Sequence, residues 1–249
     1  MGSTHATLAS VNRAAAGRWS YAGLGLFAIA VSVFSFVPSA IDTGARKGPI
    51  TALLIGHGLV YLAWLVLFVV QSLLVAGRKL DLHRRLGYSS IPLAALVVVY
   101  GYQVTITMGR RGYDMSGDLF AQADPLAAMG FPLLDVLLFL LLFAAAVILR
   151  RRPALHRRLM LLTIFAAMMP APIGHITGHF PELHGRIPFT PIFVGLFLAA
   201  SALRDLAVSR RVHPISIWLP LAIFVIENLC FLAVFPNPAW HRFAASLIH

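Results

Sequence analysis

The sequence contains seven runs of roughly 20 predominantly apolar residues, separated by short segments. Folded as a helix that rises 1.5 Å per residue, each run crosses the roughly 30 Å hydrocarbon core of a membrane. A helix also satisfies its own backbone hydrogen bonds, which hydrocarbon cannot do for it. We therefore predict an all-α, polytopic membrane protein with seven transmembrane helices. The predicted spans are residues 19–41, 50–76, 89–108, 128–149, 155–174, 188–208 and 215–235.

The composition agrees with this class and excludes several others. Charged residues make up 12% of the chain, against roughly 25% in soluble domains, so water is not its main solvent. The net charge of +11 does not indicate nucleic-acid binding, because the basic residues lie in short connections rather than in a surface stripe. The single cysteine, Cys230, excludes an internal disulfide and a Cys-based zinc or iron-sulfur site.

The distribution of Lys and Arg orients the chain, because positive residues near helix ends are retained on the cytoplasmic side. One side carries basic clusters at residues 1–18, 77–88, 150–158 and 204–214, and the other side carries few. We predict an N-in, C-out protein of the bacterial inner membrane whose basic face contacts anionic lipids. Residues 1–18 form a cytoplasmic tail, residues 19–235 the transmembrane domain and residues 236–249 an outer tail.

Two predicted cytoplasmic turns share a motif. The sequence RKLDLHRRL at residues 78–86 matches RRPALHRRL at residues 151–159. Both turns join a descending helix to an ascending one, which predicts a parallel repeat of helices 2–3 and 4–5 about an axis along the membrane normal. Arg84 and Arg157 follow a histidine at a helix start, where phosphate or anionic head groups bind, so both are candidate cofactor-binding residues. The alternative is that these turns serve topology alone.

The run from Gly56-His57-Gly58 through Trp64 and Gln71 to His83-Arg84-Arg85-Leu86-Gly87 is followed later by His156-Arg157-Arg158-Leu159-Met160. These residues resemble a family of uncharacterised bacterial inner-membrane proteins. The resemblance covers the second to fifth predicted helices. It implies the topology and brings no established activity with it.

Ionisable groups are costly inside hydrocarbon, so each one within a predicted span is a candidate for function. His57, Asp135 and Glu227 lie in the predicted outer half of the membrane, and His175 and His179 lie at the outer end of the fifth helix. The i, i+4 spacing of the last two places both imidazoles on one helix face, as many metal sites require. We predict that His57, His175 and His179 bind zinc or iron, with Glu227 and Asp135 as catalytic bases or further ligands.

The sequence leaves open whether such a metalloprotein is an enzyme. Two alternatives explain the same histidines without a zinc or non-haem iron site. The segment around His175 is rich in Pro and Gly, which break helices, so the histidines are alternatively unliganded interfacial residues. A b-type haem protein would use His57 opposite His175 or His179. A second, inner haem would lie between His83 and His156, but the predicted position of this pair near the membrane surface argues against it.

A third alternative is a transporter, or an accessory subunit of a larger membrane complex. In that case Asp135 and Glu227 would relay protons or bind a cation within the parallel repeats. The sequence leaves the substrate open, and it does not distinguish a homo-oligomer from a subunit of a complex.

Overall fold

The computed structural model describes residues 2–41, 49–112, 124–178 and 189–249. Within these ranges all regular structure is helical, and no residue is in a strand. The helices are α1 (Gly2–Ile41), α2 (Ala52–Ala76), α3 (Leu80–Gly87), α4 (Ser90–Arg110), α5 (Pro125–Ala128), α6 (Gly130–Ile148), α7 (Pro153–Phe165), α8 (Pro170–Gly178), α10 (Phe189–Leu198), α11 (Ala200–Ser209), α12 (Ile215–Leu229), the π-helical turn η2 (Cys230–Val234) and α13 (Pro238–Ile248).

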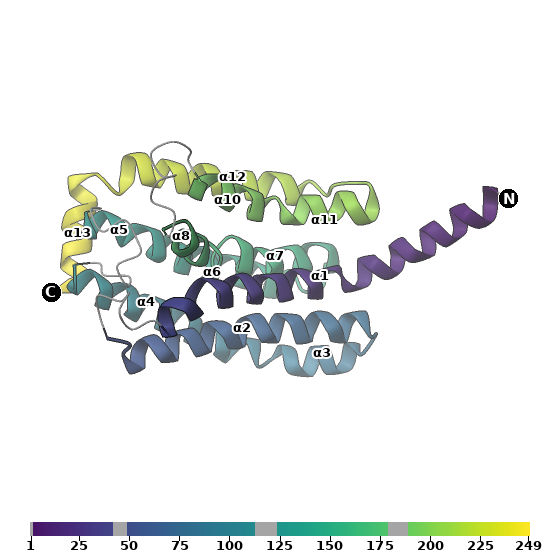
Figure 1. The fold of residues 1–249 in the computed structure, drawn as a ribbon, viewed down its shortest axis with the longest axis horizontal. Coiled ribbons are helices and arrows are strands. Elements are labelled where there is room, and N and C mark those ends of the chain that lie inside the picture. Colours follow the sequence, from purple (N-terminus) through teal and green to yellow (C-terminus); the bar gives the residue numbers. More distant parts are fainter. Residues whose placement is uncertain (1, 42–48, 113–123, 179–188) are drawn as a thin grey trace.

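Six described segments are long and apolar enough to cross a membrane, and a seventh is formed if α10 and α11, bent by 43°, count as one span. The six are Gly17–Pro38, Ala52–Ala76, Ser90–Arg110, Pro125–Ile148, Pro153–Ile176 and Ile215–Val234. Each coincides with a predicted span, and the bent pair coincides with the predicted sixth. The prediction of an all-helical chain is therefore confirmed for the described residues, and their long apolar helices are compatible with a polytopic membrane protein. Figure 1 shows the long helices, among them α2, α4, α6 and α12, running along the long axis of the molecule.

The fifth span lies at the centre of the bundle. Its most apolar stretch is 78% buried, whereas no other single-helix span exceeds 33%. Helix α7 contacts α1, α6, α10, α11 and α12. The core around it includes the aromatic side chains of Trp64, Phe139 and Phe165, all nearly inaccessible. The residues of this span are thus placed to connect elements that are far apart in the sequence.

Three details differ from the predicted helices. The fifth span is interrupted between α7 and α8, because Pro170 lacks a backbone N–H and disfavours helix in the residue before it. The sixth span is bent between α10 and α11. The turn before α4 contains a separate helix, α3, which carries His83.

The predicted outer tail folds as helix α13. Asn237 caps it by accepting a hydrogen bond from the Ala239 N–H (2.8 Å), and Pro238 occupies its first turn, as is typical of helix starts. The indole of Trp240 donates to the Leu126 carbonyl (2.7 Å), and the Arg110 guanidinium donates to the Ile248 carbonyl (3.0 Å). Helix α13 therefore crosses the ends of α4 and α5 (Figure 1).

Candidate site at the basic end

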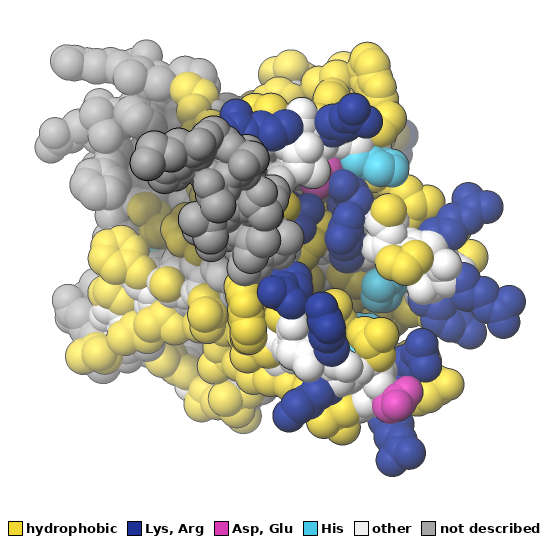
Figure 2. Space-filling view, turned by 90° about the vertical axis from the view of Figure 1, so that its right-hand side faces the viewer, with side chains coloured by type: hydrophobic (Ala, Val, Ile, Leu, Met, Phe, Trp, Pro, Cys, Tyr) yellow, Lys and Arg dark blue, Asp and Glu magenta, His cyan; other side chains and the backbone are white. Residues whose placement is uncertain are grey.

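The connections α2–α3, α6–α7 and α11–α12 meet at one end of the bundle, from which the N-terminal part of α1 extends (Figure 1). We call this the basic end, and the end covered by α13 the opposite end. Figure 2 looks onto the basic end, where Lys and Arg side chains gather around histidines. This is the end that the sequence predicts to be cytoplasmic.

A cavity of about 1130 Å³ lies at the basic end. Its inner wall is apolar and includes Trp64, Phe68, Phe143 and Met160. Its other lining residues include two histidines, and among its described lining residues there is no Asp or Glu. Such a combination suits a ligand that has an apolar body and negative charges. The arginines that line it are Arg18, Arg84, Arg150, Arg151, Arg157 and Arg204. The predicted cofactor-binding residues Arg84 and Arg157 are thus both in the cavity wall.

The two histidines of the repeated motif meet at this cavity. The ring centroids of His83 and His156 are 6.5 Å apart, with an angle of 77° between the ring planes. Nδ1 of His156 hydrogen bonds the Ala146 carbonyl (2.8 Å). Nδ1 of His83 lies 2.6 Å from the Gln71 amide, which donates to it when oriented so that its oxygen accepts from the Gly87 N–H (3.0 Å). Nδ1 of each imidazole is therefore hydrogen bonded to a residue of the preceding long helix, Gln71 of α2 for His83 and Ala146 of α6 for His156, which fixes the ring position.

Burial, the neighbouring His156 and Arg84 together lower the pKa of His83 below its ordinary value. A histidine with a lowered pKa is neutral at pH 7, and only a neutral imidazole has a nitrogen lone pair with which to bind a metal or accept a proton. Both rings are half-buried. His83 is therefore a candidate for ligand binding in its uncharged form.

One cavity arginine is held in place by a buried network that we did not predict. Arg204 donates to Asp205 Oδ1 (3.1 Å), to the Ser20 hydroxyl (2.9 Å) and to the Gly17 carbonyl (3.0 Å). Its guanidinium also lies 4.5 Å from the ring centroid of Tyr21, within cation–π distance. These contacts join α11 to α1 beside the cavity.

Asp205 is at the centre of this network and is inaccessible to solvent. It receives a bidentate ion pair from Arg158, whose Nη2 lies 2.8 and 2.7 Å from the two carboxylate oxygens. The Ser216 hydroxyl (2.8 Å) and the His213 N–H (3.2 Å) also donate to it. The sequence did contain a signal for this residue, because Asp205 is an ionisable group within the predicted span 188–208.

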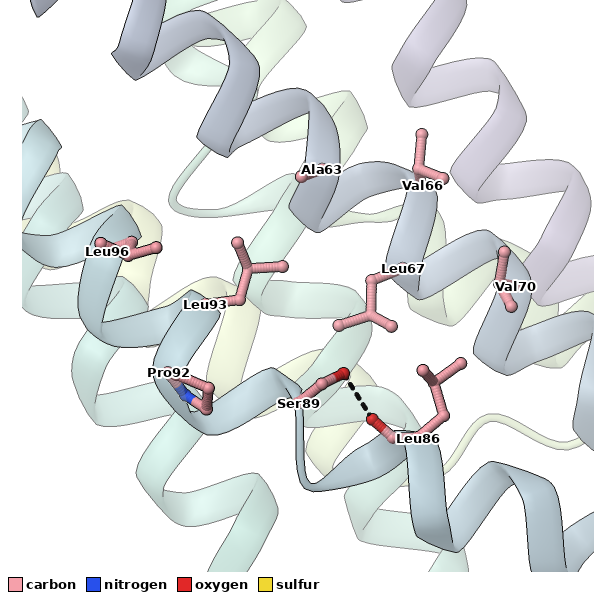
Figure 3. A pocket seen from close by; sticks show the side chains of 9 residues that line it. All are labelled: Ala63, Val66, Leu67, Val70, Leu86, Ser89, Pro92, Leu93 and Leu96. Carbon is pink, nitrogen blue, oxygen red and sulfur yellow. Dashed lines mark hydrogen bonds between the residues drawn. The ribbon is translucent and has the colours of Figure 1, made fainter.

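A second, smaller pocket of about 590 Å³ lies between α2 and the α3–α4 junction (Figure 3). Leu67 lines both this pocket and the larger cavity, so the two adjoin. Its one polar lining side chain is Ser89, whose hydroxyl already donates to the Leu86 carbonyl (2.7 Å). This groove offers apolar contact alone, so the larger cavity is the better candidate for specific binding.

Toward the opposite end, several predicted site residues lie near one another. Asp135 on α6 is close enough to Glu227 on α12 and to Tyr61 on α2 for their charges to interact. The ring of His57 lies 4.0 Å from that of Tyr61, centroid to centroid. Nδ1 of His57 and Oε1 of Glu227 are buried and have no hydrogen-bond partner among the described residues. Tyr61 thus lies near both His57 and Asp135.

The other two predicted metal ligands are not brought into this group by any described contact. His175 is buried in α8 and lies against Phe36, with ring centroids 4.9 Å apart. His179 lies outside the described residues. In the described part of the chain no three His, Cys, Asp or Glu side chains are arranged to hold a metal ion. The three-histidine metal site therefore stays a prediction.

No family model, curated protein or solved structure matches this chain.

Proposed function

We propose that this chain is an integral membrane protein that binds an anionic amphiphile in the cavity at its basic end. One observation carries the proposal: six arginines and no described acidic residue line a cavity whose inner wall is apolar. Clustered cations repel one another unless an anion is shared between them, so the arrangement favours an occupant with more than one negative charge. Arginine in particular binds carboxylate and phosphate groups through paired N–H donors.

The apolar part of the wall restricts the class of anion further. Trp64, Phe68 and Phe143 present aromatic surface at the inner side of the cavity. A small hydrated anion would leave this surface exposed to water, whereas an amphiphile covers it. The adjoining groove, reached at Leu67, gives an amphiphile in the bilayer an apolar surface beside the cavity. The function that this lining supports best is therefore binding.

Binding can be measured with the dye bis-ANS, an aromatic disulfonate whose fluorescence rises in an apolar site, using purified protein in a neutral detergent. We expect saturable binding that the double variant Arg84→Gln/Arg157→Gln weakens about tenfold, because each exposed ion pair contributes about 0.5–1 kcal/mol. The matched control is Arg85→Gln/Arg152→Gln, which removes the same charge from exposed residues outside the cavity lining. Equal weakening in both variants would contradict a specific anion site.

We also propose that the basic end faces the cytoplasm of a bacterial inner membrane, as the positive-inside rule predicts. The orientation can be tested by replacing Cys230, the one cysteine, with alanine and then introducing single cysteines. We expect a membrane-impermeant maleimide to label Ser246→Cys, in α13, in intact spheroplasts. Labelling of Arg152→Cys, in the α6–α7 connection, should require permeabilised membranes. The reverse pattern would show that the chain is inverted.

A second candidate function is a metal site near the opposite end, which the proximity of Asp135 and Glu227 and the buried, unpartnered Nδ1 of His57 favour. In this proposal His57 and the carboxylates bind zinc or iron, with His175 and His179 completing the site. Elemental analysis of the purified protein should find about one such ion per chain, and His57→Ala should remove it. Wild-type protein without zinc or iron would exclude this candidate.

A further inference from the structure

We infer that the anionic amphiphile is an iron porphyrin, haem b, whose iron is bound from opposite faces by Nε2 of His83 and Nε2 of His156. The inference rests on the proposed function, because it identifies the occupant of the same cavity. It assigns to each histidine of the repeated motif one axial position.

The separation of the two rings fits this role. An imidazole nitrogen lies about 2 Å from a metal that it binds, and the ring centroid lies about 1 Å behind that nitrogen, so two rings on opposite sides of one ion have centroids about 6 Å apart. The observed separation is 6.5 Å. The angle of 77° between the planes is compatible, because an axial imidazole can rotate about its bond to the metal.

The hydrogen bond of His156 directs its remaining nitrogen toward ligation. Metal-binding histidines usually donate their other N–H to a carbonyl or carboxylate group, which fixes the ring and its tautomer. His156 has this arrangement, because its Nδ1 lies 2.8 Å from the Ala146 carbonyl. For His83 the Gln71 amide donates to Nδ1, so ligation through Nε2 requires this amide to rotate by 180°, accept from Nδ1–H and give up its contact with the Gly87 N–H. With Gln71 rotated in this way, Nε2 is the nitrogen left for the iron in both residues.

The cavity matches the rest of the porphyrin. Its volume of about 1130 Å³ is at the upper end of ordinary ligand pockets, as a large flat ligand requires. Phe68, Phe143 and Met160 supply apolar contacts for the macrocycle, and the arginines of the rim supply partners for its two propionates. Both rings lie near the surface at the basic end, as the sequence predicts for this pair. They are nevertheless half-buried, in a cavity that extends inward to Trp64.

The test compares haem with metal-free protoporphyrin IX, which has the same propionates and no iron. We expect wild-type protein to bind haem with the absorption spectrum of a six-coordinate, low-spin bis-histidine complex. His83→Ala and His156→Ala should each abolish that spectrum and weaken haem binding more than about 100-fold, since even the loss of an outer-shell partner costs about 10- to 100-fold. Both variants should bind protoporphyrin IX as the wild type does. Arg84→Gln/Arg157→Gln should weaken the binding of both porphyrins.

Further variants make the result decisive. His156→Met keeps a side chain that can bind iron, so it should give a histidine–methionine spectrum rather than no complex. His249→Ala, at the C-terminus, should leave the spectrum unchanged. Cooperative thermal unfolding, followed by circular dichroism, identifies variants that are folded. A low-spin haem spectrum that survives loss of either histidine would overturn the inference, as would wild-type protein that binds bis-ANS and no haem. The proposed function would also be overturned if Arg84→Gln/Arg157→Gln bound bis-ANS as tightly as the wild type.

Discussion

Replacing Asp205 with asparagine is expected to lower the free energy of unfolding by about 3–5 kcal/mol, the range measured when one member of a buried ion pair is removed. The reason is that Arg158, 4% exposed, would keep its charge without the carboxylate that accepts its two-pronged contact at 2.7 and 2.8 Å. Arg204 would lose the same carboxylate. Thermal unfolding in detergent, followed by circular dichroism, measures the effect.

The control for this prediction removes both charges together. In Arg158→Met/Asp205→Leu the Arg158 charge is removed together with the carboxylate, and Arg204 alone loses its ion-pair partner, so the double variant is expected to be more stable than Asp205→Asn. The exposed pair Arg84–Asp81, 3.4 Å apart, provides a second comparison, because Asp81→Asn should change stability by no more than about 1 kcal/mol. If Asp205→Asn and Asp81→Asn have similar effects, the network around Asp205 does not stabilise the bundle.

The transmembrane helices were predictable because hydrocarbon imposes a simple length requirement on the sequence. A run such as residues 52–76 has one way to satisfy its backbone in a bilayer, and the observed helix follows the predicted span closely. Interruptions were harder to predict. Pro170 marks the break before α8. The 43° bend between α10 and α11 lies at Ala199, which is not a helix-breaking residue, so the sequence did not predict it.

The site was only partly predictable, because sequence order does not show which spans meet. We grouped the histidines by depth in the membrane, which placed His57 with His175. The structure brings together His83 on α3 and His156 on α7, 73 positions apart, a pair that we considered from the sequence only as an alternative. The shared motif did contain a signal, since a parallel repeat about a central axis places equivalent residues across that axis.

Asp205 was missed for a different reason, because the rule that would have selected it was applied to other residues and not to this one. Ionisable groups within spans are candidates for function, and this rule selected Asp135 and Glu227. Asp205 lies in a predicted span and is more buried than either, yet its neighbour Arg204 was assigned to topology alone. A carboxylate among arginines in a span is itself a prediction of a buried ion pair, because an isolated charge of either sign is too costly there.

Replacing Trp64 with alanine is expected to lower the free energy of unfolding by about 3 kcal/mol, the lower end of the range for aromatic truncations in protein cores. The lower end applies because hydrocarbon solvates apolar surface, so the loss is one of packing rather than of the hydrophobic effect. Trp64 is 1% exposed and packs edge-on against Phe139 and Phe143, with ring centroids 4.8 and 5.3 Å away. Its indole also donates to the Thr163 hydroxyl (3.3 Å).

Two variants separate these contributions. Trp64→Phe keeps an aromatic ring against Phe139 and Phe143 and loses the hydrogen bond, so its cost should be about 1 kcal/mol. Trp218→Ala removes a tryptophan that is 67% exposed, and it should leave the stability within about 0.5 kcal/mol of the wild type. Trp64 also lines the cavity, and Trp64→Phe should still bind bis-ANS because it keeps an aromatic ring in the cavity wall. An equal loss of stability in Trp64→Phe and Trp64→Ala would show that packing of the aromatic ring does not stabilise the bundle.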